Sequence, residues 1–132
     1  MRVLLVDDEE EVRAIVRRLI QQQTTFEVVG EASNGLEAIE LVEVLQPDLV
    51  VMDVQLPKLD GIEATRRIKQ RWPHIHVLAF AGDPAYVREM MEAGASGYLV
   101  KGGPTDRLIY SLGGVAGTRR IPGFSQDQAA AP

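Results

Sequence analysis

Residues 3–8 read Val-Leu-Leu-Val-Asp-Asp and residues 49–53 read Leu-Val-Val-Met-Asp, so two short apolar runs each end in acidic residues. Runs of this kind are typical of central parallel strands, which are buried on both faces. The carboxyl ends of neighbouring parallel strands border one crevice. We therefore expect Asp7, Asp8 and Asp53 to lie together at one sheet edge, where a hard cation such as Mg²⁺ would relieve their mutual repulsion.

A lysine follows a further apolar run. Lys101 comes directly after Tyr98-Leu99-Val100 and before Gly102-Gly103-Pro104. Taken alone, it is most simply a surface residue. Because three aspartates also stand at strand ends, we expect Lys101 to reach the same crevice. An acidic trio with one lysine suits chemistry on a phosphoryl group, because a metal and a lysine both neutralise anionic oxygens.

The apolar periodicity alternates between strand and helix along the chain. It predicts strands over residues 3–6, 26–32, 49–52, 76–81 and 97–100, and helices over residues 10–23, 36–45, 61–72, 84–93 and 105–112. Five βα repeats in about 115 residues predict an α/β fold, with an open, doubly wound parallel sheet and helices on both faces. Gly113, Gly114 and Gly117 make the fifth helix the weakest element.

Length and composition limit the classes of function. The 132 residues are enough for one domain with its own core, which we place over residues 1–117. Residues 118–132 lack apolar periodicity and predict a flexible tail or the start of a linker. A net charge of −5 argues against a nucleic-acid-binding surface in this segment, and the absence of cysteine excludes thiol catalysis. The N-terminal apolar run is too short for a signal peptide or a membrane span, so we expect a cytoplasmic protein with no membrane contact.

Four stretches together resemble the receiver domain of bacterial two-component response regulators, the chemotaxis-regulator-like family, over roughly residues 2–115. They are VLLVDDEEEVR from residue 3, LVVMDVQLPKLDG from residue 49, HVLAFAG from residue 76 and AGASGYLVK from residue 93. The resemblance implies a flavodoxin-like three-layer sandwich with strand order 2-1-3-4-5. EVVGEASNGLEAI, from residue 27, is similar to the subgroup whose members carry a C-terminal helix-turn-helix output domain.

The resemblance also implies a set of roles. Asp53 would accept a phosphoryl group from a sensor histidine kinase, a transfer that leaves little covalent work to the protein. Asp8, Asp53 and the backbone carbonyl of Gln55 would bind Mg²⁺, or Mn²⁺, directly, and Asp7 would act through water. Lys101 would pair with the phosphoryl oxygens. Any DNA contact would come through an output domain outside this segment, and a homodimer would form through the fourth helix, fifth strand and fifth helix.

One position departs from the family. Its members carry a Thr or Ser at the end of the fourth strand, whose hydroxyl bonds the phosphoryl group and shifts on activation. Here that position is Ala79, or Ala81 if a two-residue gap is allowed. A hydrogen bond to a charged group contributes roughly 1.5–3 kcal/mol, so we expect weaker coupling between phosphorylation and the switch. Tyr98 stands at the position of the family's switch aromatic residue. An equal alternative is that Tyr98 is an interface residue, half-buried at the edge of the sheet.

Three functions follow from these residues. The first is a phosphorylation-dependent signalling switch, the regulatory part of a transcriptional regulator, with no enzyme activity beyond its own phosphorylation and dephosphorylation on Asp53. The second is a phosphotransferase or phosphatase with an aspartyl-phosphate intermediate. Such an enzyme normally has an aspartate two residues after its nucleophile, but Gln55 stands two residues after Asp53 and Glu9 two residues after Asp7. The third is a degenerate pseudo-receiver that binds partners without phosphate. Ala79 favours this last function, and the complete aspartate and lysine set disfavours it.

Overall fold

A computed structural model describes residues 1–23 and 25–100 and contains one parallel five-stranded sheet in the order β2-β1-β3-β4-β5. The strands are β1 (Arg2–Val6), β2 (Glu27–Ala32), β3 (Leu49–Asp53), β4 (His76–Ala81) and β5 (Gly97–Val100). The helices are α1 (Glu10–Gln21), α2 (Gly35–Leu45), α3 (Gly61–Arg71), the 3₁₀ turn η1 (Pro84–Tyr86) and α4 (Val87–Glu92). The predicted fold class and strand order are confirmed. The predicted fifth helix and tail lie outside the described residues.

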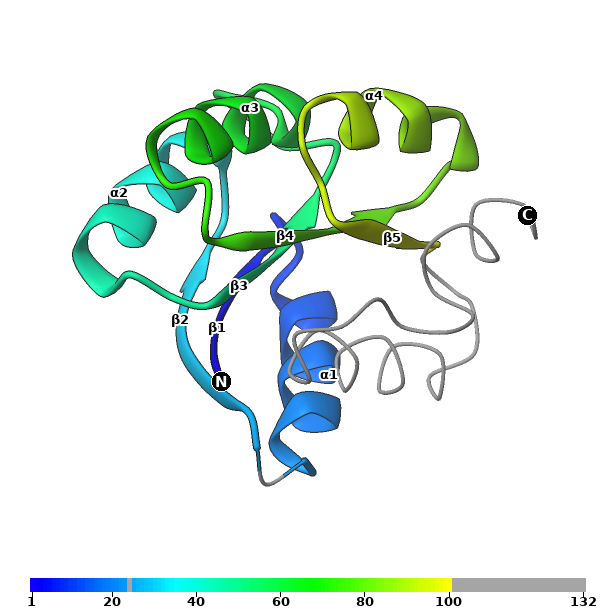
Figure 1. The fold of residues 1–132 in the computed structure, drawn as a ribbon. Helices are drawn as coiled ribbons and strands as arrows, with labels where there is room; N and C mark the ends of the chain where they lie inside the picture. The colour runs from blue at the N-terminus through cyan, green and yellow to red at the C-terminus, as the bar shows by residue number, and fades with distance from the viewer. Residues whose placement is uncertain (24, 101–132) are drawn as a thin grey trace.

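Helices cover both faces of the sheet (Figure 1). α1 packs on one face, and α2, α3 and α4 pack on the other. Leu5, Val16 and Val51 belong to the core under α1, whereas Met52 and Ile68 belong to the core on the opposite side. Successive strand residues point to opposite faces, so the unbroken apolar runs of β1 and β3 fill both cores at once. No helix within the described part of the chain is long and apolar enough to span a membrane.

The fourth predicted helix differs from the observed segment. The periodicity predicted an α-helix over residues 84–93, but the chain forms the 3₁₀ turn η1 first and becomes α-helical only at Val87. Asp83 explains the difference, because its carboxylate accepts from the backbone N–H of Ala85 at 2.9 Å and its carbonyl accepts from that of Tyr86 at 3.2 Å. These bonds close a tight turn around Pro84, which has no N–H to donate.

The start of α3 lies against the end of β3. The Asp60 carboxylate caps α3 by accepting from the backbone N–H of Glu63 at 2.8 Å. The N–H of Gly61 donates to the carbonyl of Val54 at 2.8 Å. A Cβ atom on Gly61 would lie only 1.9 Å from the carbonyl oxygen of Asp53, so a glycine is required for this approach. The short loop between β3 and α3 is thereby anchored beside Asp53.

Candidate metal and phosphoryl site

Three carboxylates gather at the carboxyl end of the sheet. Asp53 ends β3, while Asp7 and Asp8 follow β1. One oxygen from each of the three lies within 4.8 Å of the other two. The register of the sheet produces this cluster. Val6, the last residue of β1, pairs with Met52, so Asp7 directly after β1 comes level with Asp53 at the end of β3. The structure thus brings together the three acidic residues that the sequence singled out.

The three aspartates differ in exposure. Asp7 and Asp53 are 3% and 4% exposed, whereas Asp8 is exposed to solvent. Buried carboxylates at this separation repel one another unless a positive charge compensates them. Carboxylate oxygens are the ligands of hard cations, and Mg²⁺ keeps several of its waters when it binds. Two buried carboxylates with an exposed third at their edge therefore fit a partly hydrated divalent cation.

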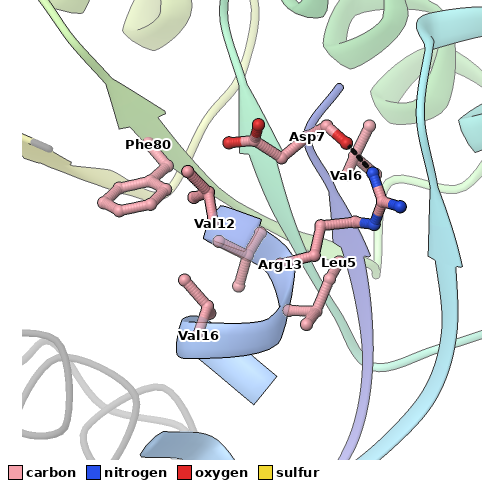
Figure 2. A pocket seen from close by; sticks show the side chains of 8 residues that line it. Leu5, Val6, Asp7, Val12, Arg13, Val16 and Phe80 are labelled. Carbon is pink, nitrogen blue, oxygen red and sulfur yellow. Dashed lines mark hydrogen bonds between the residues drawn. The ribbon is translucent and has the colours of Figure 1, made fainter. Parts of the chain in front are cut away.

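Asp7 is held by backbone and side-chain contacts. Its carboxylate accepts from the N–H of Glu9 at 2.9 Å, and its own N–H donates to the carbonyl of Ala32 on β2 at 3.0 Å. Arg13 donates to the carbonyl oxygen of Asp7 (Figure 2) and also pairs with Glu31 at 3.0 Å. The guanidinium of Arg13 thus binds the backbone at this residue and a carboxylate on β2. Two of these contacts hold the backbone of Asp7, and the bond from Glu9 restrains its carboxylate.

An apolar wall borders the acidic cluster on the α1 side. Phe80, Val12, Val16 and Val51 line a small cavity next to Asp7 (Figure 2). Phe80 is the register partner of Asp53 on β4, so both residues face the same side of the sheet. No local sequence pattern singles out Phe80. Only the register between β3 and β4 places this ring beside the predicted phosphoacceptor.

The other predicted residues that the structure describes lie in the loop after β3 and on β4 and β5. Gln55 is exposed in the loop after β3. Ala79 is fully buried and pairs with Tyr98 on β5, in the core under α3 and α4. Tyr98 is only 3% exposed, which is more buried than the half-buried interface alternative predicted. Neither Ala79 nor the equally buried Ala81 brings a hydroxyl to the end of β4. Lys101 lies outside the described residues.

The comparisons with known proteins agree with one another. The family model described as the response regulator receiver domain matches residues 3–112. The chain is 39% identical over 118 residues to the transcriptional regulatory protein DegU of Brevibacillus brevis, an alignment that covers 88% of this chain and 50% of DegU. It is 41% identical over 102 residues to the chemotaxis protein CheY of Halobacterium salinarum, covering 76% of this chain and 83% of CheY.

A solved structure shares both fold and sequence with the chain. It is the crystal structure of a LuxR-family two-component response regulator from Aurantimonas sp. SI85-9A1, with a TM-score of 0.87 and 38% identity. The match covers 98% of this chain and 94% of that one. The chain spans about half the length of DegU and of a second curated regulator, from Bacillus subtilis.

Proposed function

This chain belongs to the response regulator receiver domain family, and from that premise we propose that it accepts a phosphoryl group on Asp53 from a sensor histidine kinase. The observation that carries the proposal is the cluster in which oxygens of Asp7, Asp8 and Asp53 lie within 4.8 Å of one another. Asp53 ends a buried strand in this cluster, so its carboxylate is held in place by the sheet. A fixed carboxylate beside a cation site is what in-line phosphoryl transfer requires of a protein.

The proposed roles are those that the resemblance to receiver domains implies. A carboxylate oxygen of Asp53 attacks the phosphorus, the O–P bond forms, and the P–N bond to the kinase histidine breaks with its electron pair left on the nitrogen. Asp8, Asp53 and the backbone carbonyl of Gln55 would hold Mg²⁺ or Mn²⁺ directly, and Asp7 would hold it through water. The bound cation would neutralise the carboxylates and the phosphoryl oxygens. Lys101 would pair with the same oxygens.

The proposal extends to the partners of the whole protein. The alignments cover only about half of the relatives described as transcriptional regulators, so we propose that DNA would be contacted by an output domain outside this segment. A homodimer would form through α4, β5 and the predicted fifth helix. The chemistry of the chain would be limited to phosphorylation and dephosphorylation of Asp53, and the domain would act in the cytoplasm.

Labelling of Asp53 tests the proposal. After treatment with a small phosphodonor and Mg²⁺, intact-mass measurement should find one phosphoryl group on the wild-type protein and none on Asp53→Asn. Asp60→Asn is a matched control: it changes an exposed aspartate outside the cluster to another good helix cap and should be labelled like wild type.

The other outcomes separate the alternatives. Label that persists in Asp53→Asn would indicate that Asp7 or Asp8 is the nucleophile. A wild-type protein that takes no label, and whose NMR signals at residues 7–8 and 53–55 do not shift in millimolar Mg²⁺, would favour the pseudo-receiver. Ala79 is the specific observation behind the pseudo-receiver alternative, because neither it nor Ala81 provides a hydroxyl for the phosphoryl group.

A further inference from the structure

A hydrogen bond between two side chains connects the loop after Asp53 to the segment that begins α4. The amide nitrogen Nε2 of Gln55 donates to the hydroxyl of Tyr86 at 3.1 Å. Gln55 stands two residues after Asp53, and Tyr86 is the last residue of η1, directly before α4. The contact therefore joins the proposed metal site to a helix on the outer layer of the fold.

Tyr86 is held firmly at its own end of this contact. Its ring is half-buried and packs against the core on the α2, α3 and α4 side of the sheet. The 3₁₀ turn that carries it is closed by Asp83, which accepts from the N–H groups of Ala85 and Tyr86. The position of the hydroxyl is thus set by ring packing and by a capped turn, so it is a defined acceptor for Gln55.

Gln55 sits between anchored neighbours in the loop. Val54 is buried, and its carbonyl accepts from the N–H of Gly61 at 2.8 Å. On the other side, the carbonyl of Pro57 accepts from the N–H of Leu59 at 2.7 Å. Gln55 itself is exposed, and its side chain reaches Tyr86. The bond to Tyr86 therefore restrains the one peptide of the loop whose carbonyl is the proposed metal ligand.

We propose that Tyr86 is a positioning residue for the metal and phosphoryl site: by holding Gln55, it links the occupancy of the aspartate cluster to the conformation of η1 and α4. The inference rests on the proposed function. Coupling between two sites is reciprocal, so any gain in cation affinity that the Gln55–Tyr86 bond confers is matched by an equal stabilisation of that bond when the cation binds. We expect this stabilisation to order η1 and α4. Since Ala79 supplies no hydroxyl, the contact through Gln55 carries coupling that residue 79 does not.

The variant Tyr86→Phe tests this directly, because it removes the hydroxyl and keeps the packed ring. The full 132-residue chain is titrated with Mg²⁺, and then with beryllofluoride in saturating Mg²⁺, while NMR shifts at residues 7–8 and 53–55 are followed. The apparent Kd should rise, by up to about tenfold, because one neutral hydrogen bond sets the upper limit of the effect. Hydrogen exchange over residues 84–92 should also slow less on addition of the two ligands than it does in the wild type.

Two further variants separate positioning from general stability. Ser96→Ala removes a hydroxyl that lies 3.2 Å from Nδ1 of His76, away from the aspartate cluster, and should leave the Kd unchanged. Gln55→Met removes the donor, so adding Tyr86→Phe to it should have no further effect on the Kd. Independent, additive effects of the two changes would overturn the inference.

The remaining outcomes distinguish this inference from the proposed function. If the wild type binds both ligands and Tyr86→Phe is indistinguishable from it in Kd and in hydrogen exchange, the inference alone is overturned. If the wild type binds neither Mg²⁺ nor beryllofluoride, the proposed function is overturned and the inference with it.

Discussion

A methyl group on Gly61 should destabilise the domain and disturb the proposed phosphoacceptor at the same time. In Gly61→Ala the new Cβ would lie 1.9 Å from the carbonyl oxygen of Asp53, 2.9 Å from its carbonyl carbon and 3.0 Å from Cα of Val54. All three atoms belong to the backbone, so no side-chain rotation relieves the overlap. Either the start of α3 or the end of β3 has to move.

The size of the effect follows from two opposing contributions. Overpacking a well-packed region costs about 1–3 kcal/mol, and a contact at 1.9 Å with rigid backbone belongs at the upper end of that range. Replacing glycine by alanine in a helix stabilises the folded state by up to about 1 kcal/mol, and by less at the first helical position than in the interior. We therefore expect Gly61→Ala to lower the free energy of unfolding by about 2 kcal/mol.

Gly82→Ala provides the matched control. Gly82 is exposed, and a Cβ atom there would meet nothing within 4 Å, so the same change should be neutral or stabilising by about 0.4–1 kcal/mol. Urea unfolding followed by circular dichroism gives both values from the midpoints. NMR titration should also show weaker Mg²⁺ binding in Gly61→Ala, because Asp53 and Gln55 adjoin the displaced backbone. Unfolding at the wild-type midpoint, with normal Mg²⁺ binding, would refute the close approach.

Two further predictions concern β4. Ala79→Thr should enlarge the response of hydrogen exchange over residues 79–100 to beryllofluoride, at a stability cost of about 1–3 kcal/mol because the site is fully buried; equal responses in both proteins would show that residue 79 is not the missing contact. Burial, and then the charge of Lys69, hold the pKa of the His76 imidazole below its usual 6.5. As the pH falls, the unfolded chain therefore binds a proton at His76 before the folded chain does. The stability that neutral His76 contributes is present above pH 6.5 and is lost as the pH falls through the folded pKa. Urea midpoints should accordingly fall less between pH 7.5 and pH 5.5 in His76→Gln than in the wild type, and identical slopes would contradict the assignment.

Local patterns predicted the elements because each strand and helix is a short segment whose burial repeats along the chain. The predicted limits of β4 and β5 match the structure, and those of the other described strands differ by a single residue at one end. The fourth helix was predicted wrongly at its start, since the capped turn at Asp83 competes with α-helix in a way that apolar spacing does not reveal. Its first residues form η1 instead.

The sequence by itself determined that this is a doubly wound α/β domain and that Asp7, Asp8 and Asp53 end neighbouring strands, because burial periodicity and the topology of parallel sheets are enough for both. It also showed that the end of β4 has no hydroxyl. Only the tertiary structure decided that Phe80 lies beside Asp53 and that Gln55 bonds Tyr86. Strand register and the packing of a loop against a distant turn depend on contacts between residues far apart in the chain, and no local pattern encodes them.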